Sequence, residues 1–300
     1  MITMCADTLG TGEPRFGTGL VRRLVAEQFP AWSGLAVVPV GPGAGTSNVM
    51  YRLGEDMVVR LPRTSGAAGD VEKEHRWLPR LAPALPVAVP VPLGLGAPGP
   101  GCPWPWSVYR WLDGAIAVPG NVTDPEALAR DLAAFVTALH RADPRGGPPS
   151  YRCEPLAARD ATTREDIAAL RGEVDAGAAT AVWTEALSAP APSGPPVWIH
   201  ADLQPGNLLV ADGRLGAVID FGCLGLGDAA VDLLPAWYVL PSGAREVFRD
   251  ALGADAAAWA RGRGWALSVA LAELRHYRTA NPFMAGTARR VLARLLAGRD

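Results

Sequence analysis

Two neighbouring stretches of the chain, Trp198-Ile-His-Ala-Asp-Leu-Gln-Pro-Gly-Asn-Leu-Leu-Val210 and Ala217-Val-Ile-Asp-Phe-Gly222, decide the interpretation of this sequence. The first contains Asp202 and, five positions later, Asn207, and the second contains Asp220 at the start of an Asp-Phe-Gly triplet. Apolar residues flank these polar groups and predict short strands that end in loops. Carboxylate and amide oxygens on such loops are suited to holding Mg²⁺ near a phosphate.

Phosphoryl transfer needs few protein groups: a carboxylate that orients the attacking hydroxyl and takes its proton, and oxygen ligands for the metal. The spacing from Asp202 to Asn207, followed by the triplet at Asp220, is the order found in kinase catalytic loops. Each motif by itself is more often an ordinary turn. Because they occur together, in order and between apolar segments, they favour a kinase.

Composition excludes several other kinds of protein. The chain has 300 residues, of which 49% are hydrophobic and 19% charged, so wholesale disorder is excluded. With a net charge of −2, the chain has no excess of positive charge that would favour binding to nucleic acid or to a membrane surface. The four cysteines form no Cys-x-x-Cys pair, and no secretory signal or membrane-spanning apolar run is apparent. We therefore expect a cytoplasmic protein.

Hydrophobic periodicity predicts an α+β chain with two parts. In residues 1–112 we expect a small sheet with an embedded helix, built from helices at 20–29 and 70–81 and strands at 35–40, 49–53, 57–61, 89–95 and 106–112. In residues 113–300 we expect a larger, mostly helical part, with a helix at 124–140, an interrupted helical segment at 163–187 and further helices after 222. Short strands are expected at 197–200, 207–210 and 215–219.

Three segments together resemble the aminoglycoside phosphotransferase family: His200-Ala-Asp-Leu-Gln-Pro-Gly-Asn207, Ile219-Asp-Phe-Gly222 and Gly227-Asp-Ala-Ala-Val-Asp-Leu233. The resemblance covers roughly residues 35–295. It implies a bilobal, protein-kinase-like fold, with nucleotide bound by the N-terminal lobe and catalysis and acceptor binding in the C-terminal lobe. It also implies an enzyme that transfers the γ-phosphate of ATP or GTP to an alcohol group.

The same resemblance assigns roles to the residues of the motifs. It implies that Asp202 is the catalytic base and that Asn207 and Asp220 hold Mg²⁺. His200 corresponds to a histidine that braces the loop. Asp228 and Asp232 correspond to positions that support the loop from the next helix, although helix capping is an equal alternative for Asp228.

For the nucleotide, the small-residue loop 41–47 lies between two expected strands and resembles a phosphate-covering loop. Its candidate contacts are Gly43, Gly45, Thr46 and Ser47. Segment 107–114 resembles the family hinge, where backbone groups of Arg110 and Leu112 would meet the base.

The strand at 57–61 departs from the family pattern, because Arg60 stands where a lysine is usual. Arginine binds carboxylate and phosphate in a fork, so we expect it to take over the phosphate contact. Glu74 is its expected partner, with Glu72 as the alternative. Lys73, the single lysine of the chain, is expected to be solvated, because it leaves the helix about 100° away from Glu74.

The acceptor is the least determined part of this interpretation. Residues 151–190 hold seven acidic residues against four arginines, which could attract a polycation such as an aminoglycoside, whereas 232–300 hold six acidic residues against ten arginines. An aminoglycoside-like antibiotic is the leading acceptor. A macrolide, another natural product or a metabolic alcohol is the alternative, and a nucleotide-binding pseudokinase is a third. The sequence does not indicate an oligomeric state.

Overall fold

An antiparallel hairpin forms the centre of the first part of the computed structural model, which describes residues 16–41 and 47–297. Strands β2 (Asn48–Leu53) and β3 (Met57–Pro62) meet at Gly54, whose φ of +62° is a left-handed conformation that glycine adopts without strain. The antiparallel sheet has the order β1-β2-β3-β5-β4 and is completed by β1 (Val37–Pro39), β4 (Pro92–Gly96) and β5 (Trp106–Arg110). The predicted hairpin is therefore present.

The described chain divides into two compact units. The first comprises the chain up to Pro83 together with Ala88–Asp113 and Ile219–Gly222. The second comprises Ala84–Val87, Gly114–Val218 and the chain from Cys223 onward. The predicted division was into 1–112 and 113–300. The structure differs in two short segments, since Ala84–Val87 belong to the second unit and Ile219–Gly222 to the first.

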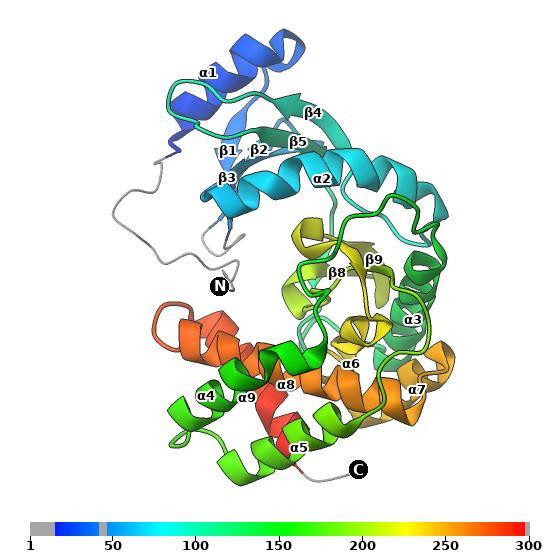
Figure 1. Cartoon of the computed structure of the whole chain (residues 1–300). Coiled ribbons are helices and arrows are strands. Elements are labelled where there is room, and N and C mark those ends of the chain that lie inside the picture. The colour runs from blue at the N-terminus through cyan, green and yellow to red at the C-terminus, as the bar shows by residue number, and fades with distance from the viewer. Residues whose placement is uncertain (1–15, 42–46, 298–300) are drawn as a thin grey trace. The chain divides into compact units, whose positions relative to one another are not determined.

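Two helices complete the first unit: α1 (Thr18–Gln28) and α2 (Ser65–Leu81), the latter lying beside the sheet in Figure 1. Val21 and Leu24 of α1 pack with Val59 and Trp106 of the sheet in one buried cluster. Burying each such side chain contributes roughly 1.5–3 kcal/mol. Helix α2 begins five residues before the predicted start, because Thr64 caps it by accepting a hydrogen bond from the N–H of Ala67 at 3.3 Å.

The second unit is mostly helical. Its helices are α3 (Pro125–Arg141), α4 (Asp160–Ala169), α5 (Ala176–Ser188), α6 (Pro235–Tyr238), α7 (Ser242–Leu252), α8 (Ala256–Tyr277) and α9 (Pro282–Leu296). Its strands are β6 (Ala115–Ile116), β7 (Val197–Ile199), β8 (Leu208–Ala211), β9 (Arg214–Val218) and β10 (Gly225–Gly227), in the sheets β6-β8-β9 and β10-β7. The sequence did not predict β6 and β10, because segments this short carry no readable alternation.

Helix α8 is the buried centre of the second unit and packs against α5 and α9. At Gly264 a Cβ atom would lie 2.5 Å from the Cβ of Ala186, so the close approach of α5 and α8 requires glycine there. The segment 163–187 is interrupted, as expected, between α4 and α5, and Asp175 caps α5 by accepting from the N–H of Ala178.

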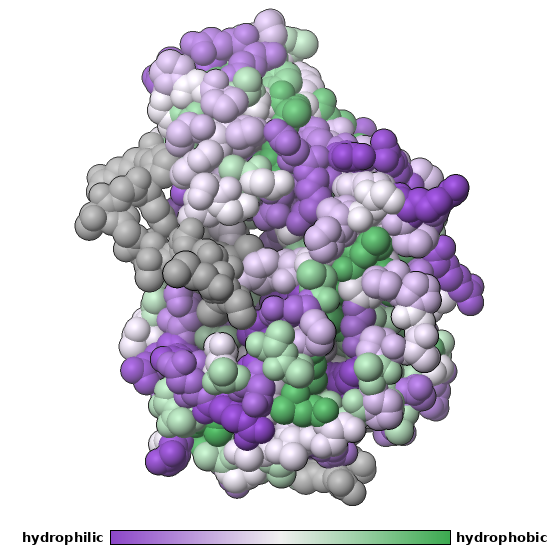
Figure 2. Space-filling model, viewed as in Figure 1, coloured by the Kyte–Doolittle hydropathy of each residue, from purple (hydrophilic) through white to green (hydrophobic). Residues whose placement is uncertain are grey.

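The face of the molecule in Figure 2 shows small apolar patches separated by hydrophilic residues. Within the residues that the structure describes, no helix has the length and apolar character to cross a membrane.

Candidate active site

The loop that carries Asp202 follows β7 and is held by a buried carboxylate of the second unit. Ala201 has a φ of +66°, a left-handed conformation that costs a residue other than glycine about 1–2 kcal/mol. The backbone N–H groups of His200 and Ala201 donate to the carboxylate of Asp232 at 3.0 and 2.7 Å. Asp232 is fully buried, and Nε2 of His140 lies 3.1 Å from its Oδ2. These charge-assisted hydrogen bonds offset the strain and hold the loop in one conformation.

Asp202 itself is held by its neighbours in the loop. The Nδ2 group of Asn207 donates to Oδ2 of Asp202 at 3.0 Å and to its carbonyl at 2.8 Å. The N–H of Asp202 donates to Nδ1 of His200 at 3.2 Å, so a neutral His200 carries its proton on Nε2. The side chain of Asp202 remains 24% exposed. The carboxylate is thus fixed in orientation and still reachable.

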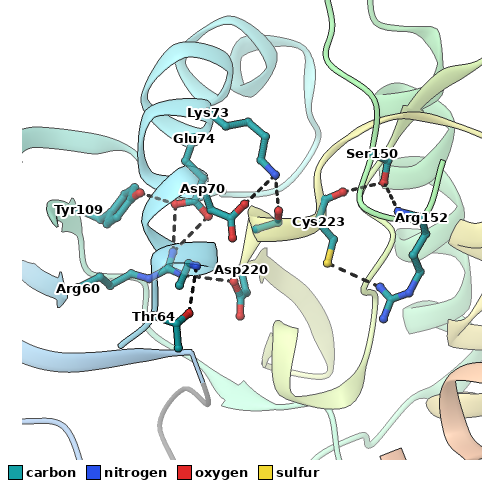
Figure 3. Close-up of polar contacts among 12 residues, drawn as sticks. Arg60, Thr64, Asp70, Lys73, Glu74, Tyr109, Ser150, Arg152, Asp220 and Cys223 are labelled. Atoms are coloured by element: carbon teal, nitrogen blue, oxygen red, sulfur yellow. Dashed lines mark hydrogen bonds and ion pairs between the residues drawn. The ribbon is translucent and has the colours of Figure 1, made fainter. Parts of the chain in front are cut away.

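Arg152 contacts the same carboxylate, a contact that was not predicted from the sequence. Its Nη1 donates to Oδ1 of Asp202 at 3.2 Å and to the carbonyl of Ala201. The same Nη1 lies 3.7 Å from Sγ of Cys223, as Figure 3 shows. Burial disfavours the charge, but the acidic groups around the guanidinium outweigh burial and hold its pKa above the ordinary value. No motif marks this arginine, which precedes Asp202 by 50 positions.

A buried acid also reaches Asp202 through an amide. The Nε2 group of Gln204 donates to Oδ1 of Asp202 at 3.1 Å and to Oε1 of Glu273 at 2.5 Å. The hydroxyl of Tyr238 donates to Oε2 of Glu273 at 2.9 Å. Burial, and then the charge of Asp202, raise the pKa of Glu273 to about 7. Glu273 was not predicted from the sequence, although a single acid among the apolar residues of α8 is a signal that could have marked it, because a carboxylate is rarely buried without a partner.

In the first unit, Arg60 binds two carboxylates (Figure 3). Its Nη1 lies 3.1 Å from Oε2 of Glu74, and its Nη2 lies 3.2 Å from Oδ1 of Asp220. The hydroxyl of Tyr109 donates to the same Oε2 of Glu74. Burial disfavours the charge of Arg60, but the two carboxylates outweigh it and raise its pKa above the ordinary value. The structure therefore pairs Arg60 with Glu74 and not with Glu72, which is exposed.

The segment around Asp220 is fixed by helix α2 of the same unit. Asp220 has a φ of +62°, a second left-handed residue other than glycine in the predicted site. Lys73 donates to the carbonyl of Gly222 and to Oδ1 of Asp70 at 2.9 Å, with a side chain that is 18% exposed. The prediction that Lys73 is solvated is therefore wrong, because the helix turns its ammonium group onto a segment 149 positions away.

The remaining nucleotide candidates are only partly described. Gly43, Gly45 and Thr46 lie outside the described residues. The carbonyl of Ser47 accepts from the N–H of Arg63 at 3.0 Å, which fixes the end of the loop where β2 begins.

The two hinge candidates lie at the end of β5. The N–H of Arg110 donates to the carbonyl of Val91 at 3.0 Å, so a contact with a nucleotide base at Arg110 would use its carbonyl. Leu112 follows the last residue of β5 by two positions.

The predicted magnesium ligands offer suitable donor atoms, each within its own unit. Asn207 uses its amide nitrogen for Asp202, which leaves the amide oxygen as the donor atom. The side chain of Asp220 is 45% exposed, and its Oδ1 lies 3.2 Å from Nη2 of Arg60. Amide and carboxylate oxygens are the ligands that Mg²⁺ prefers. Among the described residues there is no cluster of three or more His, Cys, Asp or Glu residues suited to a metal.

A family model described as the phosphotransferase enzyme family, APH, matches residues 40–265. The chain belongs to this family. The prediction of an aminoglycoside phosphotransferase family member with a kinase-like fold is confirmed, as is its assignment to phosphotransferases. No match was found among curated proteins.

Solved structures of APH proteins share this fold. The GDP and kanamycin complex of APH(2")-IIia has a TM-score of 0.73 and 20% identity, with 92% of this chain and 98% of that chain covered. The GDP complex of wild-type aminoglycoside 2'-phosphotransferase-IIIa has a TM-score of 0.74 and 19% identity, covering 94% and 99%. Macrolide 2'-phosphotransferase MphH from Brachybacterium faecium has a TM-score of 0.60 and 24% identity, also covering 94% and 99%.

Proposed function

We propose that this APH-family chain transfers the γ-phosphate of ATP or GTP to a hydroxyl of a small molecule, with Asp202 as the base. The proposal rests on the environment of Asp202. Its carboxylate is partly exposed and is held in orientation by Asn207. The strained loop that carries it is anchored by Asp232. Strain at an anchored loop is a common property of reactive sites.

In the proposed reaction, Asp202 accepts a hydrogen bond from the acceptor hydroxyl and takes its proton as the oxygen attacks the γ-phosphorus. A new O–P bond forms, the bond between the γ-phosphorus and the bridging oxygen breaks, and the nucleoside diphosphate leaves with the bonding electrons. Asn207 keeps the Oδ2 side of the carboxylate in place, so the proton acceptor does not rotate away.

Arg60 is proposed to bind the nucleotide phosphates in place of the usual lysine, oriented by Glu74. Two carboxylates keep its guanidinium charged and directed, which supports this role. Asn207 and Asp220 are proposed to hold Mg²⁺, which when bound neutralises phosphate charge. The related structures that contain GDP or ADP support a nucleotide as co-substrate.

An aminoglycoside-like antibiotic is the acceptor that the resemblance places first, and related structures include a kanamycin complex. A macrolide, another natural product or a metabolic alcohol is the alternative, and related structures also include macrolide phosphotransferases. One observation favours the alternative: the acidic residues of 151–190 are engaged within the second unit, chiefly with arginines.

The test is consumption of ATP and of GTP with Mg²⁺ against a panel of aminoglycosides, macrolides and simple alcohols, with the product identified by mass spectrometry. An increase in mass of one phosphoryl group on an acceptor, with matching nucleoside diphosphate, supports the proposal. Nucleotide binding without consumption for every acceptor would instead support a pseudokinase.

A further inference from the structure

Six of the seven acidic residues of 151–190 pair with arginines of the second unit. Asp166 and Glu165 both pair with Arg275 at 2.8 Å, and Glu173 pairs with Arg289 at 3.0 Å. The remaining contacts are Glu154 with Arg159 at 3.7 Å, Asp160 with Arg164 at 2.7 Å, Glu185 with Arg263 at 3.7 Å, and Asp175 as the cap of α5.

Three of these arginines, Arg263, Arg275 and Arg289, belong to α8 and α9. The acidic excess of 151–190 and the arginine excess of 232–300 therefore largely cancel. These seven residues therefore do not form an acidic surface that could attract a polycation.

The base itself is also neutralised. Arg152 pairs with Oδ1 of Asp202 at 3.2 Å, and its own side chain is only 12% exposed. Since the carbonyl of Ala201 accepts from the same Nη1, the guanidinium is bound to the backbone as well as to the carboxylate. A buried ion pair with a backbone contact is far less screened by salt than a surface pair. An ammonium group close to Asp202 would therefore meet a pair without net charge.

Glu273, the other acid near the base, does not replace the lost negative charge. It is 7% exposed, and both of its oxygens accept hydrogen bonds, from Gln204 and Tyr238. Its carboxylate is therefore directed into the protein and not toward a ligand.

This inference rests on the proposed function. We propose that Arg152 is a specificity-determining residue, which cancels the charge of Asp202 and makes the enzyme select neutral or singly charged hydroxylated acceptors over polycations. A deoxystreptamine aminoglycoside such as kanamycin carries several ammonium groups around its hydroxyls. These groups gain little electrostatic binding energy at Asp202, because Arg152 already neutralises it. A macrolide carries one amine, so the neutralised carboxylate costs it little binding energy.

The test compares wild type, Arg152→Gln and Arg152→Lys. Binding of kanamycin is measured by calorimetry, and kcat/KM for kanamycin and a macrolide is measured at low and high ionic strength. Arg152→Gln removes the positive charge beside Asp202. It should tighten kanamycin binding about tenfold and make it salt-dependent, because the unpaired carboxylate of Asp202 then attracts the ammonium groups. Arg152→Lys keeps the charge and should behave like wild type in the ratio of the two acceptors, even if kcat falls.

The matched control is Arg130→Gln, which removes one positive charge of the same unit from an exposed pair with Glu126 on α3. It should change neither acceptor's kinetics, and thermal melting checks that each variant is folded. Arg152→Gln binding kanamycin no more tightly than wild type overturns the proposal, as does a wild type that prefers kanamycin with a KM rising with salt. Absence of transfer to every acceptor would instead refute the proposed function, while the kanamycin titration still decides the role of Arg152.

Discussion

Arg60 and Asp220 are joined by an ion pair of 3.2 Å, although 160 positions separate them in the chain. The arginine that stands at the family's lysine position is thus bound to the predicted magnesium ligand as well as to Glu74. Arginine has two separate nitrogens for these contacts, whereas a lysine offers one ammonium group. The substitution is therefore compatible with a charged, directed phosphate-binding residue.

Arg60→Ala should raise the KM for nucleotide sharply, and Glu74→Ala should raise it less, because Glu74 acts through the arginine. The double variant should show a coupling energy of about 0.5–3 kcal/mol in kcat/KM for nucleotide. Glu72→Ala is the control, since Glu72 is exposed on the same helix and should leave the KM unchanged. Simply additive losses in the double variant would contradict the pairing.

Asp202→Asn should lower kcat by roughly 10²–10⁴-fold, the usual contribution of a general base, with little change in nucleotide affinity. Steady-state kinetics on an active acceptor and nucleotide titration measure the two quantities. Asp212→Asn is the control, because Asp212 is an exposed carboxylate of the same unit with a left-handed backbone that asparagine tolerates. Near-normal turnover of Asp202→Asn would show that the base is another group.

Asp232→Ala should lower the free energy of unfolding by about 2–5 kcal/mol, because two buried N–H groups, of His200 and Ala201, lose their charged acceptor. It should also lower kcat, since the strained loop is released. Asp228→Ala serves for comparison: Asp228 caps a 3-10 helix by accepting from Ala230 and contacts Arg261, so its loss should reduce stability without releasing the loop. Urea denaturation and kinetics on both variants check this; equal losses of kcat would contradict it.

Glu273 should make stability depend on pH in a defined direction. Its pKa is raised from 4.5 to about 7 in the folded chain, so the folded state binds more protons than the unfolded state between these values. The free energy of unfolding should therefore fall as the pH rises through this window, by at most about 3 kcal/mol from this group.

Glu273→Gln removes the titration and should flatten that part of the curve. Urea denaturation of wild type and variant at pH 5, 6, 7 and 8 measures the difference, which should favour the variant increasingly as the pH rises. Parallel curves would show that Glu273 does not titrate in this window.

The local features of this protein could be predicted from the sequence. The hairpin of β2 and β3, the capped helix α3 and the spacing of Asp202 and Asn207 depend on residues a few positions apart. Local periodicity and turn chemistry determine such features, and the catalytic-loop motif was enough to identify the family and with it the fold. The start of α2 was missed because Gly66 and Gly69 weaken the helical signal that the Thr64 cap restores.

Only the tertiary structure decided which distant polar and charged groups meet. Arg152 reaches Asp202 over 50 positions, Glu273 reaches Gln204 over 69, and Lys73 reaches Gly222 over 149. Periodicity reports whether a residue faces the core, and it contains no information on which charged side chain of another segment arrives at the same place. These pairings follow from how helices and loops pack, and they determine the charge around Asp202, the proposed base.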